Sequence, residues 1–265
     1  MQFGFFGKLM TVDLATGTIG RRGITEAECR NLLLGSGYAA KLLYDELDPA
    51  RDPLDPRNSL VFIRGLLNGL VLPGCSKFLV CARSPLTGIW GESAAGGHFH
   101  RQFSAAGWDG VVFTGAAARP VYLWIDDERA ELRDASHLWG LDTFETNAKL
   151  KGETDPKAIV ACIGPAGENG VLYASIMFDG IVARAAGRCG MGTVMGAKNL
   201  KAVVVRGTGK VPVKDPDGLA AALKEQIPGI AAATKGLHDF STAGGIEAVE
   251  LHGDLPIKKD RKSVV

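Results

Sequence analysis

The sequence predicts an α+β fold with mainly antiparallel strands and few helices, followed by the start of a helical domain. Strand-like runs rich in β-branched and aromatic residues come in clusters, without the helix between successive strands that a parallel sheet requires. The 35 glycines concentrate between these runs, as expected where backbone needs positive φ or lies close to a ligand. Near residue 210 this pattern gives way to a polar segment and then a helical one.

The order of the predicted elements follows from these runs. The predicted strands are Leu9–Leu14, Leu60–Arg64, Phe78–Ala82, Gly110–Thr114, Val121–Asp126, Ala158–Ile163, Leu172–Met177 and Lys201–Arg206. The acidic run at 126–128 predicts a hairpin turn into a further strand, Ala130–Arg133. The predicted helices are Thr25–Glu46, broken near Gly35 and Gly37, then His98–Ala106, Thr143–Lys151 and Asp217 to about Ile227.

The best candidate for a domain boundary is the segment 207–217, which holds glycine, proline and charge with little apolar periodicity. We therefore expect a first domain over residues 1–210. Residues 211–265 would form a linker and the incomplete start of a helical second domain. Its polar ending, PIKKDRKSVV, contains no evident terminating element.

Composition excludes several function classes. Lys plus Arg is 30 against 29 for Asp plus Glu, so no overall field favours nucleic acid or an anionic membrane surface. Neither a membrane-spanning apolar run nor a secretion signal is apparent, so the sequence predicts a cytoplasmic protein without membrane insertion. The five cysteines are scattered, odd in number and never in a C-x-x-C pair, which indicates reduced thiols that mostly fill the core.

The strongest local pattern is the segment 179–201, where glycines alternate with four cations, Arg184, Arg188, Lys198 and Lys201. Accessible backbone N–H groups and planar guanidinium forks suit oxyanions such as phosphate. A tight turn with solvated lysines is the simpler interpretation and has about equal weight. A dinucleotide fingerprint at Gly190, Gly192 and Gly196 is disfavoured, because the predicted strand from Lys201 leaves no room for the long helix that should follow.

Two weaker clusters carry further candidates. Ala94-Ala95-Gly96-Gly97 precedes a helical segment and would place free amides at its start, although an ordinary helix start explains the pattern equally well. Gly164–Asn169 follows a predicted strand and indicates a turn in which Glu168 could orient a polar ligand group. His98 and His100 have a metal-like spacing but point to different faces of a helix, so no metal is assigned to them.

These segments, taken together and in order, resemble the N-terminal domain of the aldehyde:ferredoxin oxidoreductases over roughly residues 1–210. Each piece alone is weak, but the set is specific. The segments that carry the resemblance are Gly7–Leu14, Asp55–Asn58, Ser84–Gly88, Gly96-Gly97, Ala105–Asp109, Gly164–Asn169, Ala185–Arg188 and Val194–Ala202.

The resemblance implies a base of two related β-sheets on which a tungsten, sometimes molybdenum, bis-pyranopterin cofactor lies. The metal in this family is held by the pterin dithiolenes, so no protein metal ligand is expected in this domain. The family positions that contact the cofactor fall on Lys77, Ala94, Ala95, Gly96, Arg184, Ala185, Gly187 and Arg188.

Three departures from the family pattern limit what carries over. Lys77 stands where the family usually has arginine, which exchanges a bidentate fork for a point charge. Ala94-Ala95 replaces Asn-Ser, and the lost asparagine carbonyl argues against the magnesium ion that bridges the pterin phosphates in some members. The cysteines of the family's [4Fe–4S] cluster and its acid/base residues lie downstream of Val265, so we assign no catalytic residue here.

The resemblance therefore implies the cofactor-binding portion of an oxidoreductase that acts on aldehyde or oxo groups. A ferredoxin-like protein would accept the electrons, and a homo-oligomer is compatible with the sequence. Two alternatives stay open. One is a non-catalytic or degenerate family module without bound metal, and the other is an NAD-dependent dehydrogenase.

Overall fold

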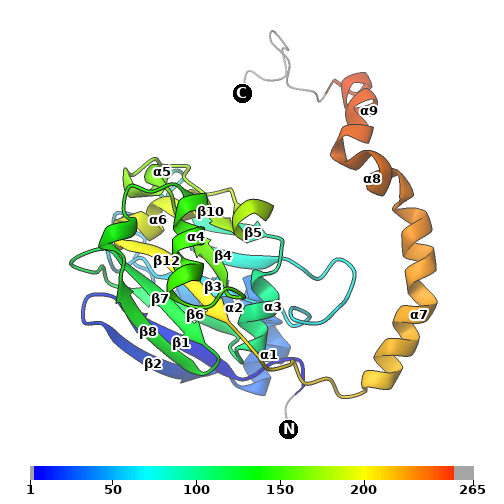
Figure 1. The fold of residues 1–265 in the computed structure, drawn as a ribbon, viewed down its shortest axis with the longest axis horizontal. Helices are drawn as coiled ribbons and strands as arrows, with labels where there is room; N and C mark the ends of the chain where they lie inside the picture. The colour runs from blue at the N-terminus through cyan, green and yellow to red at the C-terminus, as the bar shows by residue number, and fades with distance from the viewer. Residues whose placement is uncertain (1–2, 254–265) are drawn as a thin grey trace. The chain divides into compact units, whose positions relative to one another are not determined.

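A computed structural model describes residues 3–253 of the chain. The chain divides into two compact units, Met1–Val213 and Lys214–Val265, and the first contains both β-sheets (Figure 1). The strands of one sheet are β1 (Lys8–Asp13), β2 (Thr18–Gly23), β3 (Leu60–Ile63), β4 (Phe78–Arg83), β5 (Trp90–Ala95) and β6 (Gly110–Thr114). Those of the other are β7 (Val121–Asp126), β8 (Arg129–Asp134), β9 (Ile159–Cys162), β10 (Ile176–Phe178), β11 (Arg184–Ala186) and β12 (Leu200–Arg206).

The two sheets have the same topology. The strand order is β2-β1-β6-β3-β4-β5 in the first sheet and β8-β7-β12-β9-β10-β11 in the second. Each strand of the second sheet therefore has the number of its counterpart in the first sheet plus six. In both sheets one ladder is parallel, β1 with β6 and β7 with β12, and the other ladders are antiparallel. The predicted α+β class with mainly antiparallel pairing is confirmed.

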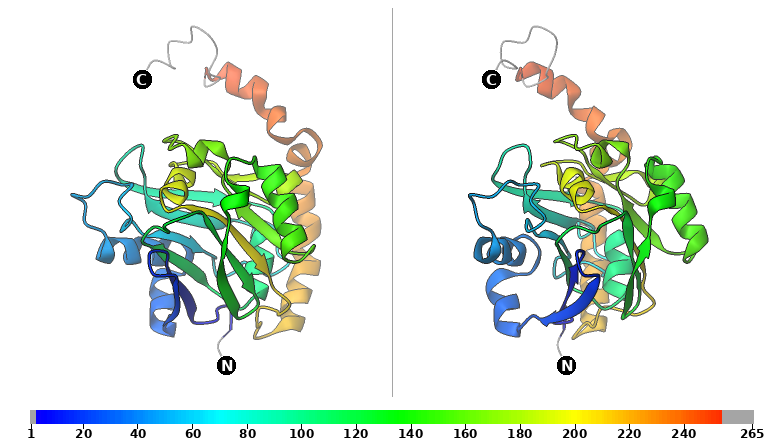
Figure 2. Two further views of the ribbon diagram at one scale, coloured as in Figure 1. Left: turned by 60° about the vertical axis from the view of Figure 1, so that its left-hand side comes forward. Right: turned by 90° about the vertical axis from the view of Figure 1, so that its left-hand side faces the viewer.

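Helices cover the outer faces of the two sheets (Figure 2). The helices of the first unit are α1 (Glu26–Leu32), α2 (Gly35–Glu46), α3 (Phe99–Ala105), α4 (Thr143–Glu153), α5 (Pro165–Glu168) and α6 (Met191–Ala197), with short 3-10 turns at η1 (Ser136–Leu138) and η2 (Gly180–Val182). A capping box between Thr25 and Glu28 starts α1. Leu33 and Leu34 then adopt positive φ, which separates α1 from α2 close to the predicted break.

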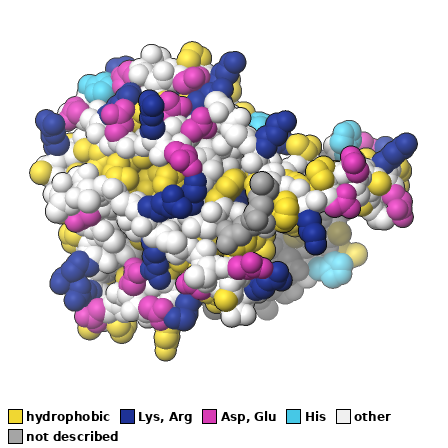
Figure 3. All heavy atoms as spheres, turned by 90° about the horizontal axis from the view of Figure 1, so that it is seen from below, with side chains coloured by type: hydrophobic (Ala, Val, Ile, Leu, Met, Phe, Trp, Pro, Cys, Tyr) yellow, Lys and Arg dark blue, Asp and Glu magenta, His cyan; other side chains and the backbone are white. Residues whose placement is uncertain are grey.

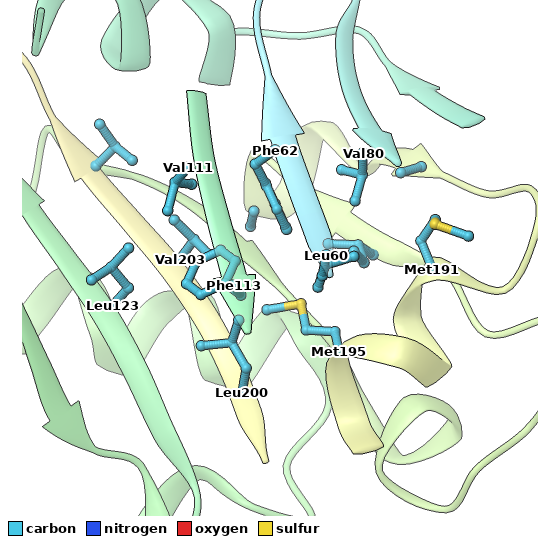
Figure 4. Packing of buried hydrophobic residues seen from close by; sticks show 14 of the residues in the cluster. Leu60, Phe62, Val80, Val111, Phe113, Leu123, Met191, Met195, Leu200 and Val203 are labelled. Carbon is cyan, nitrogen blue, oxygen red and sulfur yellow. The ribbon is translucent and has the colours of Figure 1, made fainter. Parts of the chain in front are cut away.

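The alternation of side chains along each strand builds three layers of core. Leu60 and Phe62 of β3 point into the space between the sheets, where they meet Val203 of β12 and the methionines of α6 (Figure 4). Val61 and Ile63, on the opposite face of β3, pack under α1 and α2. Leu150 of α4 belongs to a third cluster on the outer face of the second sheet. The core between the sheets includes Ala95 of β5 and Ala186 of β11, so both of these outer strands are packed against it.

A buried imidazole makes the stability of this unit depend on pH. His100 is 3% exposed, and its Nδ1 accepts a hydrogen bond of 3.1 Å from the backbone N–H of Gly69. Burial, with a smaller effect from Arg101, lowers the pKa of His100 from 6.5 to about 4. Because the unfolded chain takes up this proton at higher pH than the folded chain, the stabilisation is complete above pH 6.5 and is lost as the pH falls towards 4.

We expect this protonation to lower the free energy of unfolding by about 3 kcal/mol between pH 7 and pH 4. Urea unfolding at the two pH values measures the difference. His100→Gln should retain less of this pH dependence than the wild type. An unchanged slope in the variant would show that other groups cause it.

The second unit is helical over its described part. It contains α7 (Pro216–Ala233), α8 (Lys235–Phe240), a 3-10 turn η3 (Ser241–Gly245) and α9 (Ile246–Leu251). None of its described residues is buried. Among residues 3–253, no helix combines the length and apolar character of a transmembrane span. The assignment of residues 211–265 to a linker and an incomplete helical domain stays a prediction.

Several elements differ from those predicted. Strands β2, β5 and β11 and helix α6 were not expected, and the predicted strand Leu172–Met177 is ordered as a strand only from Ile176. The reason lies in the carbonyl groups before Ile176. Ala174 accepts the backbone N–H of Gly192 at 2.9 Å, and Val171 accepts the hydroxyl of Thr193. These carbonyl groups bind residues at the start of α6, so they are not available for pairing with a neighbouring strand.

Candidate cofactor-binding site

The outermost strands β5 and β11 bring the two sheets together at one place. Each is the last strand of its sheet, in topologically equivalent positions. The backbone N–H of Arg188, just after β11, donates to Ser93 Oγ of β5 at 3.0 Å. Cys189 Sγ lies 3.6 Å from the carbonyl oxygen of Glu92, also on β5. The segments 94–96 and 184–188, which the sequence could only name separately, therefore flank one shared edge.

The same tripeptide ends both strands. Ala94-Ala95-Gly96 closes β5 and Ala185-Ala186-Gly187 closes β11, with the first alanine exposed and the second buried in each case. Small exposed side chains leave the backbone N–H groups of both edges accessible. This repeat, 91 residues apart, is a signal in the sequence that could have linked the two halves of the site.

Three unpaired cations surround the shared edge. Phe78 pairs with Ala95 at the end of the β4–β5 ladder, and Lys77 and Gly96 are the chain neighbours of this last pair. Lys77, Arg184 and Arg188 are all exposed, and within residues 3–253 their side chains form no hydrogen bond or ion pair. Cations that are not used by the protein are available to an anionic ligand.

Gly96 and Gly187 are not explained by packing. Neither has positive φ, and a Cβ would meet only Ser76 Oγ at 4.0 Å in the first case and Ala185 Cβ at 3.7 Å in the second. By contrast, a Cβ on Gly97 would lie 2.0 Å from Asp179 Oδ2, and one on Gly190 would lie 2.0 Å from the carbonyl oxygen of Leu172. The open glycines are those expected where a ligand approaches the backbone.

Replacing Gly187 with valine is expected to block ligand approach and leave the fold intact. The added side chain meets little protein, so the free energy of unfolding should change by less than about 1 kcal/mol. If the tungsten cofactor implied by the sequence resemblance binds here, protein-bound tungsten measured by elemental analysis should fall severalfold. Gly23→Val is the matched control, because Gly23 also lacks positive φ and has no atom within 4 Å of an added Cβ. Equal tungsten in the two variants would contradict a ligand at Gly187.

The two lysines of the 179–201 segment do not belong to this edge. Lys198 is buried, and its Nζ donates to the carbonyl oxygens of Pro56 at 2.6 Å and Gly115 at 3.1 Å. Burial lowers the pKa of Lys198 to about 8. Lys201, also buried, pairs with Glu168 and donates to the carbonyl oxygen of Leu141 at 2.9 Å. The interpretation of both lysines as solvated was wrong, and Glu168 is occupied by a structural ion pair.

The later glycines of the segment shape the packing of α6. A Cβ on Gly192 would lie 2.5 Å from the carbonyl oxygen of Ser175, and one on Gly196 would lie 2.0 Å from that of Gly167. Helix α6 ends at Ala197 and β12 begins at Leu200, so no long helix follows the glycines. The structural condition for a dinucleotide site is not met.

Asp179 and His98 lie at the same edge, although no role was predicted for Asp179. Asp179 Oδ2 accepts the backbone N–H of His98 and lies 3.3 Å from His98 Nδ1. His100 Nδ1 instead accepts the backbone N–H of Gly69. Over residues 3–253, no group of three or more His, Cys, Asp or Glu side chains could hold a metal ion.

The face of the molecule drawn in Figure 3 is not dominated by charge of one sign. On the face shown in Figure 3, basic and acidic side chains are interspersed around an apolar patch. A separate apolar groove of about 520 Å³ contains none of the predicted site residues. It is lined by Ala40, Leu43, Tyr44, Leu47, Pro49, Arg83, Gly88, Ile89 and Trp90. Trp90 is the first residue of β5, so the groove lies at the start of this strand, whereas Ala94, Ala95 and Gly96 lie at its end.

Three of the five cysteines are buried away from the shared edge and are chemically unreactive. Cys29, Cys81 and Cys162 are buried, and burial raises the pKa of each thiol, that of Cys162 to about 12. A thiol with a raised pKa is a poor nucleophile and a poor metal ligand at neutral pH. All five cysteines are free, so the prediction of reduced thiols agrees with the structure.

The protein is thus an α+β base of two topologically equivalent sheets. Glycines and exposed cations lie at the shared edge of β5 and β11. The family model described as "Aldehyde ferredoxin oxidoreductase, N-terminal domain" matches residues 9–207. The chain belongs to this family.

Relatives and a solved structure agree with this assignment. The chain is 40% identical over 267 aligned residues to the tungsten-containing aldehyde ferredoxin oxidoreductase of Pyrococcus horikoshii, covering 99% of the chain and 44% of the relative. It is 33% identical to the WOR-like subunit of an aliphatic sulfonate oxidoreductase of Pyrococcus furiosus, covering 84% and 38%. The BamBC active site complex of benzoyl coenzyme A reductase superimposes with a TM-score of 0.81 at 39% identity, covering 86% and 35%. The chain thus spans less than half the length of these proteins.

Proposed function

We propose that this chain is the cofactor-binding portion of a tungsten or molybdenum bis-pyranopterin oxidoreductase that acts on aldehyde or oxo groups. The observation that carries the proposal is the pairing of two equivalent edges, each ending in Ala-Ala-Gly, in one place. A ligand with two like halves, each bearing a phosphate, matches a site with two like edges. Tungsten in the names of the relatives supports the same cofactor.

The residues present fit such a group. Lys77, Arg184 and Arg188 would hold the phosphates, since they are exposed and unpaired within the described part of the chain. The backbone at Ala94, Ala95 and Gly96 on one edge, and at Ala185 and Gly187 on the other, would line the pterins. When bound, the cofactor supplies the metal and dithiolene sulfurs at which substrate is oxidised or reduced. The chain itself anchors, orients and shields the cofactor from water.

The finer assignments follow the family. Electrons would pass through a [4Fe–4S] cluster, held by residues downstream of Val265, to a ferredoxin-type carrier in the cytoplasm. Magnesium is not included, because Ala94 offers no side-chain carbonyl at the position where some members use asparagine.

A second candidate is reduction of an oxo or acyl compound. The structural neighbour whose name describes a benzoyl coenzyme A reductase shares 39% identity, almost the same as the aldehyde enzymes at 38–40%. Sequence identity over this domain therefore does not distinguish between the two reactions. Under either reaction the family's acid/base residues would lie downstream of this chain, and we assign no catalytic residue within it.

The proposal is tested on the native protein isolated anaerobically from cells. Elemental analysis should find about one tungsten or molybdenum per chain, and oxidative degradation should release two pterins per metal. Aldehyde oxidation coupled to a viologen dye then separates the first candidate from the second. A protein without metal, pterin or cluster would establish the alternative of a non-catalytic module.

A further inference from the structure

The carboxylate of Asp179 connects the two halves of the shared edge. The backbone N–H of Asp179 donates to the carbonyl oxygen of Val160 at 3.2 Å, which connects Asp179 to β9 of the second sheet. Its side chain crosses to the first sheet, where Oδ2 accepts the backbone N–H of His98. The two residues are 81 positions apart, so this contact is tertiary and joins the segment before β11 to the segment after β5.

The backbone around Asp179 is built to allow this contact. Asp179 has φ of +63°, a left-handed conformation that a non-glycine residue adopts rarely. Gly97 has φ of +92°, and a Cβ there would lie 2.0 Å from Asp179 Oδ2 and 3.0 Å from Arg184 Cγ. Two unusual backbone conformations therefore coincide where the carboxylate, the glycine loop and Arg184 meet.

Within residues 3–253 the contact leaves one carboxylate oxygen of Asp179 without a hydrogen-bond partner, and the His98 ring lies beside the other oxygen. The Asp179 side chain is 2% exposed, and no described residue donates a hydrogen bond to its Oδ1. His98 Nδ1 lies 3.3 Å from Oδ2, while the His98 side chain is 56% exposed. A purely structural carboxylate would be expected to use both oxygens, because a buried acceptor without a donor is unfavourable.

We propose that Asp179 is a positioning residue for the cofactor phosphates. By holding His98 and the Gly96-Gly97 loop against the start of β11, it sets the spacing of the two edges before the ligand binds, and it orients the His98 imidazole at the rim. Preorganisation of this kind raises affinity because the loops do not have to be ordered during binding. This role rests on the proposed phosphate site.

The test measures binding of inorganic pyrophosphate by calorimetry to the full chain, produced in a host that makes no pyranopterin. Asp179→Ala should weaken binding about tenfold. Asp179→Asn should bind within about threefold of the wild type, because its amide oxygen can still accept the His98 N–H. The ¹⁵N signals of the His98 ring report the local role, and should shift in Asp179→Ala.

A double-mutant cycle with Gly97→Ala separates positioning from general destabilisation. Gly97→Ala alone should weaken binding, since its methyl group collides with the carboxylate. In the Asp179→Ala background the same change should have a smaller effect. If Asp179→Ala does not fold, Gly97→Ala and Asp179→Asn still carry the test, and wild-type affinity in Gly97→Ala overturns the proposal.

Arg188→Ala distinguishes this proposal from the proposed function. Weakened binding in Arg188→Ala with wild-type affinity in Asp179→Ala overturns only the role of Asp179. Wild-type affinity in both variants, or no binding by the wild type itself, overturns the phosphate site as well. Loss in both, with recovery in Asp179→Asn, supports both.

Discussion

Arg188→Ala is expected to retain no more than about a tenth of the wild-type tungsten. Arg188 is exposed and its side chain forms no hydrogen bond or ion pair within residues 3–253, so its removal breaks no polar contact there. Its backbone N–H to Ser93 Oγ survives the substitution, which keeps β5 and β11 together. The loss would therefore reflect one missing charge-assisted contact to phosphate, which is worth tenfold or more in affinity.

The matched control is Arg129→Ala. Arg129 is also an exposed arginine of the second sheet, but it lies on β8 at the opposite edge from β11. Tungsten per chain is measured for both variants by elemental analysis after identical purification. If Arg188→Ala and Arg129→Ala contain the same amount of metal, Arg188 does not anchor the cofactor.

Asp109→Ala should have the largest effect on stability, about 3–5 kcal/mol. Asp109 pairs with Arg64 at 2.9 Å, and both side chains are fully buried. Asp109 also accepts the backbone N–H groups of Phe6 and Lys8. Desolvation lowers the pKa of Arg64 and the nearby carboxylate opposes this, so removing Asp109 leaves a buried guanidinium without its counter-charge.

Urea unfolding monitored by circular dichroism measures this loss. Glu26→Ala is the control, because it removes an exposed partner of Arg30 and should change stability by less than about 1 kcal/mol. A loss below 1 kcal/mol in Asp109→Ala would mean that Arg64 finds other acceptors after its partner is removed.

The sequence was sufficient to predict the core strands but not the edge strands β5 and β11. The runs 60–63 and 202–205 are apolar on both faces, as expected where both faces of a strand are buried, and they were found. The sequences of β5, WGESAA, and β11, RAA, contain few β-branched or aromatic residues, so they have little intrinsic preference for strands. They are extended because β4 and β10 provide hydrogen-bonding partners, which is tertiary information.

The candidate site was predicted by resemblance more than by physical pattern. The glycine and arginine content of the 179–201 segment indicated an anion site, but it could not separate exposed Arg184 and Arg188 from buried Lys198 and Lys201. Lysine buries when its ammonium group reaches backbone carbonyls, as Lys198 does, and composition does not reveal such acceptors. Asp179 was missed because its role depends on a contact 81 positions away.

The central claim is that the edges formed by β5 and β11 jointly hold a two-pterin metal cofactor. Anomalous diffraction at a tungsten absorption edge, on crystals of the native protein, locates the metal directly. We expect the metal peak beside these two edges, with one phosphate within hydrogen-bonding distance of Arg188 or Arg184 and the other near Lys77 and Gly96. A metal peak remote from the edges, or phosphates bound by other loops, would contradict the account.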